Sequence, residues 1–224
     1  MRPFTSTLIA ALTLAAAFAH AAEPAPTASG KPIVVPAFDD TYSKLVKKLE
    51  SGQTDIDYRA FRESFLKSKQ FQIAVSKRAE LDRLKAALPA LMANRSFDEI
   101  VKTTKSILSI DYTNMRAHKI LYQTYKALKD EPNQKRHHDI EFGLLNSIVK
   151  NGDGKSCATA WPVVQIEEEY FILEMVGATL KKQILDDKGG LCDKMEVSTD
   201  EGKAATYYFG VEKVFEGREK LQRK

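Results

Sequence analysis

Residues 151–171 read NGDGKSCATAWPVVQIEEEYF, and the pattern of the chain changes within this stretch. Before Gly154 the apolar residues recur at helical spacing, whereas after it β-branched and aromatic residues gather in short runs. The sequence therefore predicts an α+β protein. Its N-terminal tetratricopeptide-like helical hairpins should pack on a C-terminal antiparallel β-sheet of about five strands.

The helical part is most strongly periodic in its second half. Ala117, Leu121 and Tyr125 have the spacing of the small residue, leucine and tyrosine in the first helix of a tetratricopeptide repeat, which this part resembles. We expect one to two repeat-like hairpins. Since a stable array needs about three repeats, these helices must pack on another part of the chain.

Short runs of β-forming residues follow Gly154 and are separated by turn signals. We expect five strands, near residues 159–166, 169–176, 179–186, 191–198 and 204–211. Connections this short force neighbouring strands to be antiparallel. Pro162 cannot donate to a ladder, which puts the first strand at an edge or makes it start late.

The GDGKS segment looks like a phosphate loop but lacks its spacing. Val149 stands where a Walker loop needs its first glycine, and a helix precedes the segment where a strand is required. Asp153 also lacks the alternating acids of an EF-hand. We expect Gly152 to cap the preceding helix with a positive φ, and Asp153 and Gly154 to turn the chain into the sheet.

The stretch quoted above contains the residues that we consider candidates for either a functional site or a structural turn. These residues are Asn151, Gly152, Asp153, Gly154, Lys155, Ser156, Glu168, Glu169 and Tyr170. We expect the acidic triplet at residues 167–169 to form a solvated hairpin turn. Use of such carboxylates in catalysis needs a cleft and a shifted pKa.

Motifs of known enzymes and metal sites are missing from the sequence. It contains no Gly-x-Ser-x-Gly and no His-Glu-x-x-His pattern. His137 and Glu141 lie four residues apart, which is the spacing of two metal ligands on one face of a helix. Two ligands do not make a site, and a surface cluster is expected. The sequence therefore predicts no catalytic residue, no metal site and no cofactor.

The N-terminus predicts export. Arg2 precedes an apolar run at residues 8–18, and Ala19-His20-Ala21 suits cleavage by a signal peptidase after Ala21. The run is shorter than the about 20 residues that a membrane span needs, so the mature chain should be soluble and periplasmic or secreted. The expected organisation is a signal peptide (1–21), a linker (22–36), a helical repeat-like region (37–150), a sheet region (151–215) and a charged tail (216–224).

Cys157 and Cys192 are the two cysteines of the chain. In an oxidising compartment a lone pair predicts a disulfide, with two unpaired thiols as the alternative. The formal net charge is +4, and the basic residues are spread over several segments. Such a distribution is typical of a solvated face, so no nucleic acid is expected as a partner.

Residues 146–171, NSIVKNGDGKSCATAWPVVQIEEEYF, resemble the hallmark of an uncharacterised family of exported bacterial proteins, domain of unknown function forty-nine nineteen. Weaker matches are Asp57-Tyr58-Arg59, Gln183-Ile184-Leu185, Cys192-Asp193-Lys194-Met195 and Tyr208-Phe209-Gly210-Val211. The resemblance covers residues 42–215. It implies no activity and no catalytic residue.

Three classes of function remain open at this point. The favoured class is a non-catalytic module of the cell envelope, which binds a protein or peptide at the groove between the hairpins and the sheet. The first alternative is a hydrolase-type enzyme with a site around Asp153, Lys155, Glu168 and Glu169. The second is a structural envelope protein. No membrane span is expected after signal cleavage, and the oligomeric state stays open.

Overall fold

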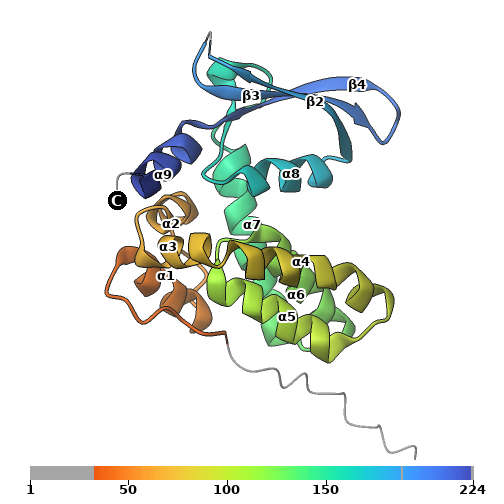
Figure 1. Ribbon diagram of the computed structural model, residues 1–224. Helices are drawn as coiled ribbons and strands as arrows, with labels where there is room; N and C mark the ends of the chain where they lie inside the picture. The colour runs from red at the N-terminus through yellow and green to blue at the C-terminus, as the bar shows by residue number, and fades with distance from the viewer. Residues whose placement is uncertain (1–32, 188, 223–224) are drawn as a thin grey trace, which may run out of the picture.

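The computed structural model describes residues 33–187 and 189–222, in which a layer of helices lies against a small sheet (Figure 1). The helical layer contains α1 (Thr41–Glu50), α2 (Tyr58–Phe65), α3 (Lys69–Ser76), α4 (Arg78–Ala93), α5 (Phe97–Ile110), α6 (Met115–Ala127) and α7 (Glu131–Val149). The C-terminal part contains the 3₁₀ turn η1 (Cys157–Thr159), β1 (Trp161–Pro162), α8 (Ile166–Met175), β2 (Ala178–Asp186), β3 (Cys192–Thr199), β4 (Ala204–Gly210) and α9 (Glu212–Gln222). The predicted α+β class is confirmed.

Polar side chains cap the N-termini of most helices in the helical layer. In five cases the side chain accepts the backbone N–H three positions on, and the residues are Asp40, Asp57, Ser68, Asn114 and Asp130. Each such cap typically stabilises a helix by about 1 kcal/mol. These local signals explain why the helices begin where they do.

Two pairs of adjacent helices, α4 with α5 and α6 with α7, form the hairpins that the periodicity predicts. Residues 94–96 join the first pair and residues 128–130 join the second, and connections this short place the two helices side by side and antiparallel (Figure 1). Whether these hairpins are tetratricopeptide repeats stays a prediction.

An aromatic cluster holds the N-terminal helices to the turn between α5 and α6. Tyr42 stacks on Phe61 with ring centroids 5.4 Å apart and contacts Phe65 at 5.0 Å. The Tyr42 hydroxyl also accepts the backbone N–H of Tyr112 at 2.9 Å. All four of these side chains are buried, so this cluster is part of the core of the layer.

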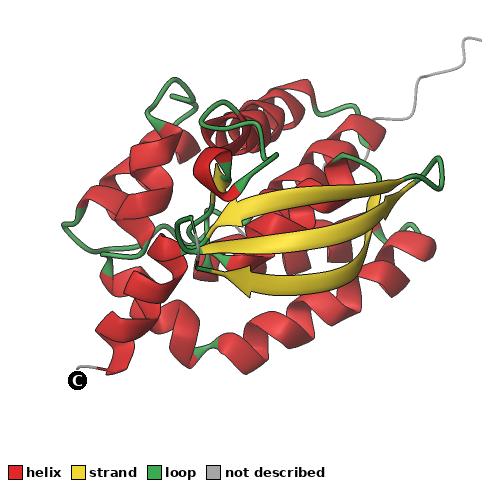
Figure 2. Cartoon of the chain, turned by 90° about the horizontal axis from the view of Figure 1, so that it is seen from above, coloured by secondary structure: helices red, strands yellow, loops and turns green. Residues whose placement is uncertain are grey.

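The sheet has the order β1-β4-β3-β2 and lies across one face of the helices (Figure 2). Strands β2, β3 and β4 form the expected antiparallel meander, with Met195 opposite Gln183 on one side and Tyr207 on the other. The two-residue strand β1 lies at the edge and pairs parallel to β4, so the described sheet is mixed and has four strands, and the expected antiparallel sheet of about five strands is wrong in these two respects. The rule for short connections does not apply to β1, because its partner β4 is not the next strand along the chain. The expected edge position of the strand that contains Pro162 is confirmed.

The expected strand at residues 169–176 is wrong, because residues 166–175 form α8. The Glu168 carboxylate accepts the backbone N–H groups of Val164 at 2.8 Å and Gln165 at 3.4 Å, which caps the helix at its start. Acidic residues in a first turn also interact favourably with the helix dipole. These terms, together with burial of Phe171 and Ile172, override the strand propensity of the segment.

The solvated turn expected for residues 167–169 is therefore also wrong. These residues form the first turn of α8, where Glu168 and Glu169 are buried and Glu167 is half-buried. Figure 1 shows α8 between the sheet and α4, a position that takes its inward-facing side chains out of water.

The connection from α7 to the sheet contains the glycine-rich segment. The positive φ expected at Gly152 is wrong, because Gly154 has it, with φ of 65°. Gly152 is required for another reason, since a Cβ there would lie 2.4 Å from the carbonyl oxygen of Thr159. The Asp153 carboxylate accepts the backbone N–H of Lys155 at 3.0 Å, as the turn prediction requires.

The predicted disulfide between Cys157 and Cys192 is present, and their Cα atoms are 5.7 Å apart. The bond joins η1 to the start of β3 across a sequence separation of 35 residues. A cross-link of this span typically stabilises the folded state by about 3–4 kcal/mol.

The described residues begin within the predicted linker and end within the predicted charged tail. The predicted signal peptide and residues 22–32 of the predicted linker lie outside the described residues. At the other end α9 covers residues 212–222, so the described part of the predicted charged tail is helical. Within residues 33–187 and 189–222, no helix has the length and apolar character to cross a membrane.

Candidate functional site

A groove of about 360 Å³ lies between α8 and the helical layer. Its wall is mainly apolar and comes from α4, α5, α6 and α8, with side chains of Leu88, Pro89, Met92, Ile107, Met115, Ala117, Ile120 and Phe171. The groove therefore opens where the hairpins meet the C-terminal part, although the facing wall is α8 and not a strand of the sheet.

Asp111, directly after α5, is a buried acid in the lining of the groove and is 3% exposed. Its Oδ1 accepts the backbone N–H of Thr113 at 2.9 Å and the Thr113 hydroxyl at 2.6 Å. Its Oδ2 accepts the side-chain amide of Gln165 at 3.2 Å. Burial raises the pKa of Asp111, while these hydrogen bonds act in the opposite direction.

Ion pairs join both ends of α8 to the helical layer. Near its start, Glu167 lies 3.0 Å from Arg78 and 3.8 Å from Lys85 of α4. Near its end, Glu174 pairs with Lys119 of α6 at 3.1 Å, and also with Arg116. Exposed pairs of this kind contribute about 0–1 kcal/mol each. They link α8 to α4 and α6 on the two sides of the groove.

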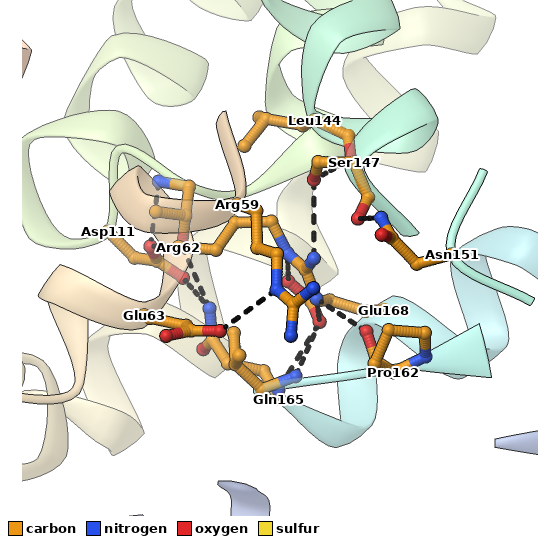
Figure 3. A network of polar contacts seen from close by, with 12 residues as sticks. Arg59, Arg62, Glu63, Asp111, Leu144, Ser147, Asn151, Pro162, Gln165 and Glu168 are labelled. Carbon is orange, nitrogen blue, oxygen red and sulfur yellow. Dashed lines mark hydrogen bonds and ion pairs between the residues drawn. The ribbon is translucent and has the colours of Figure 1, made fainter. Parts of the chain in front are cut away.

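A buried ion pair anchors the start of α8 more firmly (Figure 3). Arg62, which is 1% exposed, donates from Nε to Oε1 of Glu168 at 2.7 Å and from Nη2 to Oε2 at 2.6 Å. The same guanidinium donates to the Pro162 carbonyl at 3.0 Å and to the Ser147 hydroxyl at 3.2 Å. Through the contacts of Arg62, the Arg62–Glu168 pair therefore joins α2, α7, β1 and α8.

Glu169 is completely buried, next to Asp193 of β3. No donor within the described part of the chain reaches either carboxyl oxygen of Glu169, and a protonated Glu169 can itself donate to Asp193. Burial, and next the charge of Asp193, raise the pKa of Glu169 to about 9. Asp193 itself accepts the Gln183 amide at 2.6 Å, and the Tyr170 hydroxyl donates to Gln183 at 2.9 Å. At neutral pH Glu169 is therefore protonated and uncharged.

His137 is buried against His118, so the surface cluster expected around His137 and Glu141 is wrong. The two Nδ1 atoms lie 3.0 Å apart, and Nε2 of His118 lies 2.9 Å from the Tyr112 carbonyl oxygen. Since a carbonyl only accepts, His118 carries its proton on Nε2, and its Nδ1 accepts from His137. Burial lowers the pKa of both rings, to about 4 for His118, so the pair is neutral.

The residues predicted from the sequence fall into two groups. Residues 151–156 form the connection between α7 and η1 and do not line the groove. Glu168 and Tyr170 line it, and Glu169 lies behind it, next to the sheet. The carboxylates of the hydrolase alternative thus do not share one pocket, since Asp153 is exposed on the connection while Glu168 is bound to Arg62.

Sequence reasoning missed the groove residues themselves, above all Asp111, Lys85 and Gln165. Asp111 follows an apolar helix and precedes Thr113 by two positions, which is a local turn signal. That signal indicates a turn between two helices, and only the position of α8 makes this turn the floor of a groove.

The family model described as Domain of unknown function (DUF4919) matches residues 38–220. The match begins before α1 and ends within α9, so it covers the helical layer, the groove and the sheet together. No curated protein and no solved structure matches the chain.

Proposed function

The chain belongs to the family described as Domain of unknown function (DUF4919), and we propose that it is a non-catalytic binding protein that holds a peptide segment of a partner in the groove beneath α8. The observation that carries the proposal is the groove itself. Its volume of about 360 Å³ is within the range of ligand pockets and suits one or two side chains of an extended segment.

Two large and partly exposed side chains, one from α4 and one from α8, line this groove. Met92 and Tyr170 line it and are 43% and 41% exposed. Large apolar side chains grouped at a concave site favour an interaction surface, and methionine adapts its shape to varied partners. The groove is therefore suited to apolar contact with a peptide.

The polar groups of the groove favour binding over catalysis. Its lining in the described chain includes no serine, cysteine or histidine. Glu167, Glu168 and Glu174 each pair with a basic residue, and the carboxylate of Asp111 accepts hydrogen bonds from Thr113 and Gln165, so each acid of the groove already has a polar partner.

We place this binding protein in an oxidising compartment, either the cell envelope or the exterior. Support for this location comes from the disulfide between Cys157 and Cys192, because such bonds persist outside the reducing cytosol.

Selection of phage-displayed random dodecapeptides on the immobilised protein tests the proposal. Recovered peptides should lose at least about tenfold in affinity on Met92→Glu, because the charge takes the place of an apolar contact at the mouth. Val75→Glu is the matched control, since Val75 is equally 43% exposed but lies on α3, outside the groove.

Two results would contradict the proposed function. The first is a set of peptides that bind Met92→Glu and Val75→Glu equally well. The second is a failure to recover any peptide in repeated selections.

A further inference from the structure

All but one of the acidic side chains that line the groove form an ion pair with a basic side chain. Three of the four have a basic partner within 3.8 Å, namely Glu167, Glu168 and Glu174. Asp111 forms no ion pair with any residue that the structure describes, and its hydrogen bonds come from the neutral donors Thr113 and Gln165. Asp111 is therefore the acid of the described groove lining that is buried without an ion-pair partner.

Lys85 is the base whose charge acts on Asp111. It also lies 3.8 Å from Glu167, and its side chain is 27% exposed, so its charge is shared between two acids and partly screened by water. A buried carboxylate held by neutral donors keeps a desolvation penalty. A cation that enters the groove would offset this penalty.

The apolar walls of the groove would suit a cationic ligand that also carries an alkyl chain. Leu88, Met115 and Phe171 line it together with Asp111. Lysine and arginine side chains bury their methylene stems on apolar surface while their charged heads reach a polar partner. An alkyl chain that ends in a cation matches this combination of an apolar wall and an acid.

We infer that the groove takes the side chain of a lysine or arginine of the bound peptide, with its cationic head on the Asp111 carboxylate and its stem along Leu88, Met115 and Phe171. This inference rests on the proposed function and names the ligand class of the same site. A charge-assisted hydrogen bond is roughly twice as strong as a neutral one, so Asp111 is the residue that sets specificity.

Fluorescence polarisation with labelled pentapeptides Leu-Ala-X-Ala-Leu tests the inference, where X is lysine, arginine, norleucine or glutamate. Norleucine keeps the aliphatic stem of lysine and removes the ammonium. On the unmodified protein the lysine or the arginine peptide should bind at least about tenfold more tightly than the norleucine peptide, and the glutamate peptide most weakly.

Asp111→Asn should reduce this preference to about threefold or less, because it removes the charge and keeps an acceptor for Thr113. Asp153→Asn is the matched control. Asp153 likewise accepts a backbone N–H two residues on and a threonine hydroxyl, but it is exposed and lies outside the groove, so the preference should stay unchanged.

Lys85→Met provides a second variant in case Asp111→Asn does not fold. Lys85 competes for Asp111, so its removal should tighten binding of the lysine peptide by about threefold or more and leave the norleucine peptide unaffected. Weaker binding of the lysine peptide to this variant would count against the inference.

The outcomes separate the inference from the proposed function. Equal binding of the lysine and norleucine peptides, or no binding of either cationic peptide, overturns the role of Asp111. The proposed function survives that result if peptides are recovered by selection. Free 1,5-diaminopentane that binds as tightly as the lysine peptide would overturn the assignment to a peptide and point to a small amine.

Discussion

The guanidinium of Arg62 and the carboxylate of Glu168 form a buried bidentate ion pair at 2.6–2.7 Å, although 106 residues separate them along the chain. Arg62 belongs to α2 and Glu168 to α8, so this contact ties the first helices to the helix that covers the groove. Both side chains are nearly inaccessible to water, at 1% and 3%.

Arg62→Met should lower the free energy of unfolding by about 3–5 kcal/mol, because it leaves the Glu168 carboxylate buried without its counter-charge. The double variant Arg62→Met with Glu168→Gln should recover part of this loss. Urea denaturation of the four proteins in this cycle measures the coupling between the two residues. A loss below about 1 kcal/mol in the single variant would show that the ion pair does not hold α8 to α2.

Stability should fall as the pH rises above neutrality, because of Glu169. Its pKa is raised to about 9, so its contribution is fully present below the pKa of the unfolded chain and is lost as the pH rises toward 9. Glu169→Gln should flatten the dependence of the free energy of unfolding on pH between 6.5 and 9. Denaturant titrations at several pH values compare the two proteins, and parallel curves would argue against a protonated Glu169.

Acidification should destabilise the protein through His118 and His137. Their pKa values are lowered in the folded state, so the stability is present above the ordinary histidine value of about 6.5 and is lost as the pH falls toward 4. In a Glu169→Gln background, the melting temperature should drop over this window. The double variant His118→Gln and His137→Gln should show a smaller drop, and an unchanged drop would assign the effect to other groups.

Gly152→Val and Gly154→Val should each lower the free energy of unfolding by about 1–3 kcal/mol or more, for different reasons. At Gly152 the side chain would meet the Thr159 carbonyl oxygen, and at Gly154 it would require a positive φ and press on Trp161. Lys155→Ala should change stability by less than about 0.5 kcal/mol, since Lys155 is exposed. Thermal melts of the three variants should show a clearly lower melting temperature for the two glycine variants and little change for Lys155→Ala. A rise in melting temperature with nucleotide and magnesium that disappears in Lys155→Ala would instead support a phosphate site.

The Cys157–Cys192 bond should contribute about 3–4 kcal/mol to the free energy of unfolding. Urea denaturation of a variant in which serine replaces both cysteines should show a loss of this size. Thiol titration of the unfolded, non-reduced protein should detect no free thiol. Detection of two thiols in protein produced under oxidising conditions would contradict the bond.

Local signals in the sequence were sufficient for several features of this fold. Asp57 caps α2 because its side chain reaches a backbone N–H three residues away, a contact that depends only on the neighbouring chain. The antiparallel meander of β2, β3 and β4 follows from short connections, and the position of Pro162 at an edge follows from its missing N–H. The pairing of Cys157 with Cys192 needed no choice between partners, since the chain has two cysteines.

Local capping by Glu168 favours the start of α8, but only tertiary contacts placed this helix over the helical layer and so formed the groove. Tyr170, Phe171 and Ile172 have strand propensity, but the Arg62 partner that stabilises Glu168 at the start of the helix lies 106 residues earlier. Burial of Glu169 and of the His118–His137 pair likewise depends on partners from other elements. Caps and turns depend on contacts between neighbouring residues, so they can be predicted from the sequence. The charge and accessibility of a side chain depend on segments that are distant in the sequence. For this reason the groove that Asp111 lines beneath α8 could not be predicted without the tertiary structure.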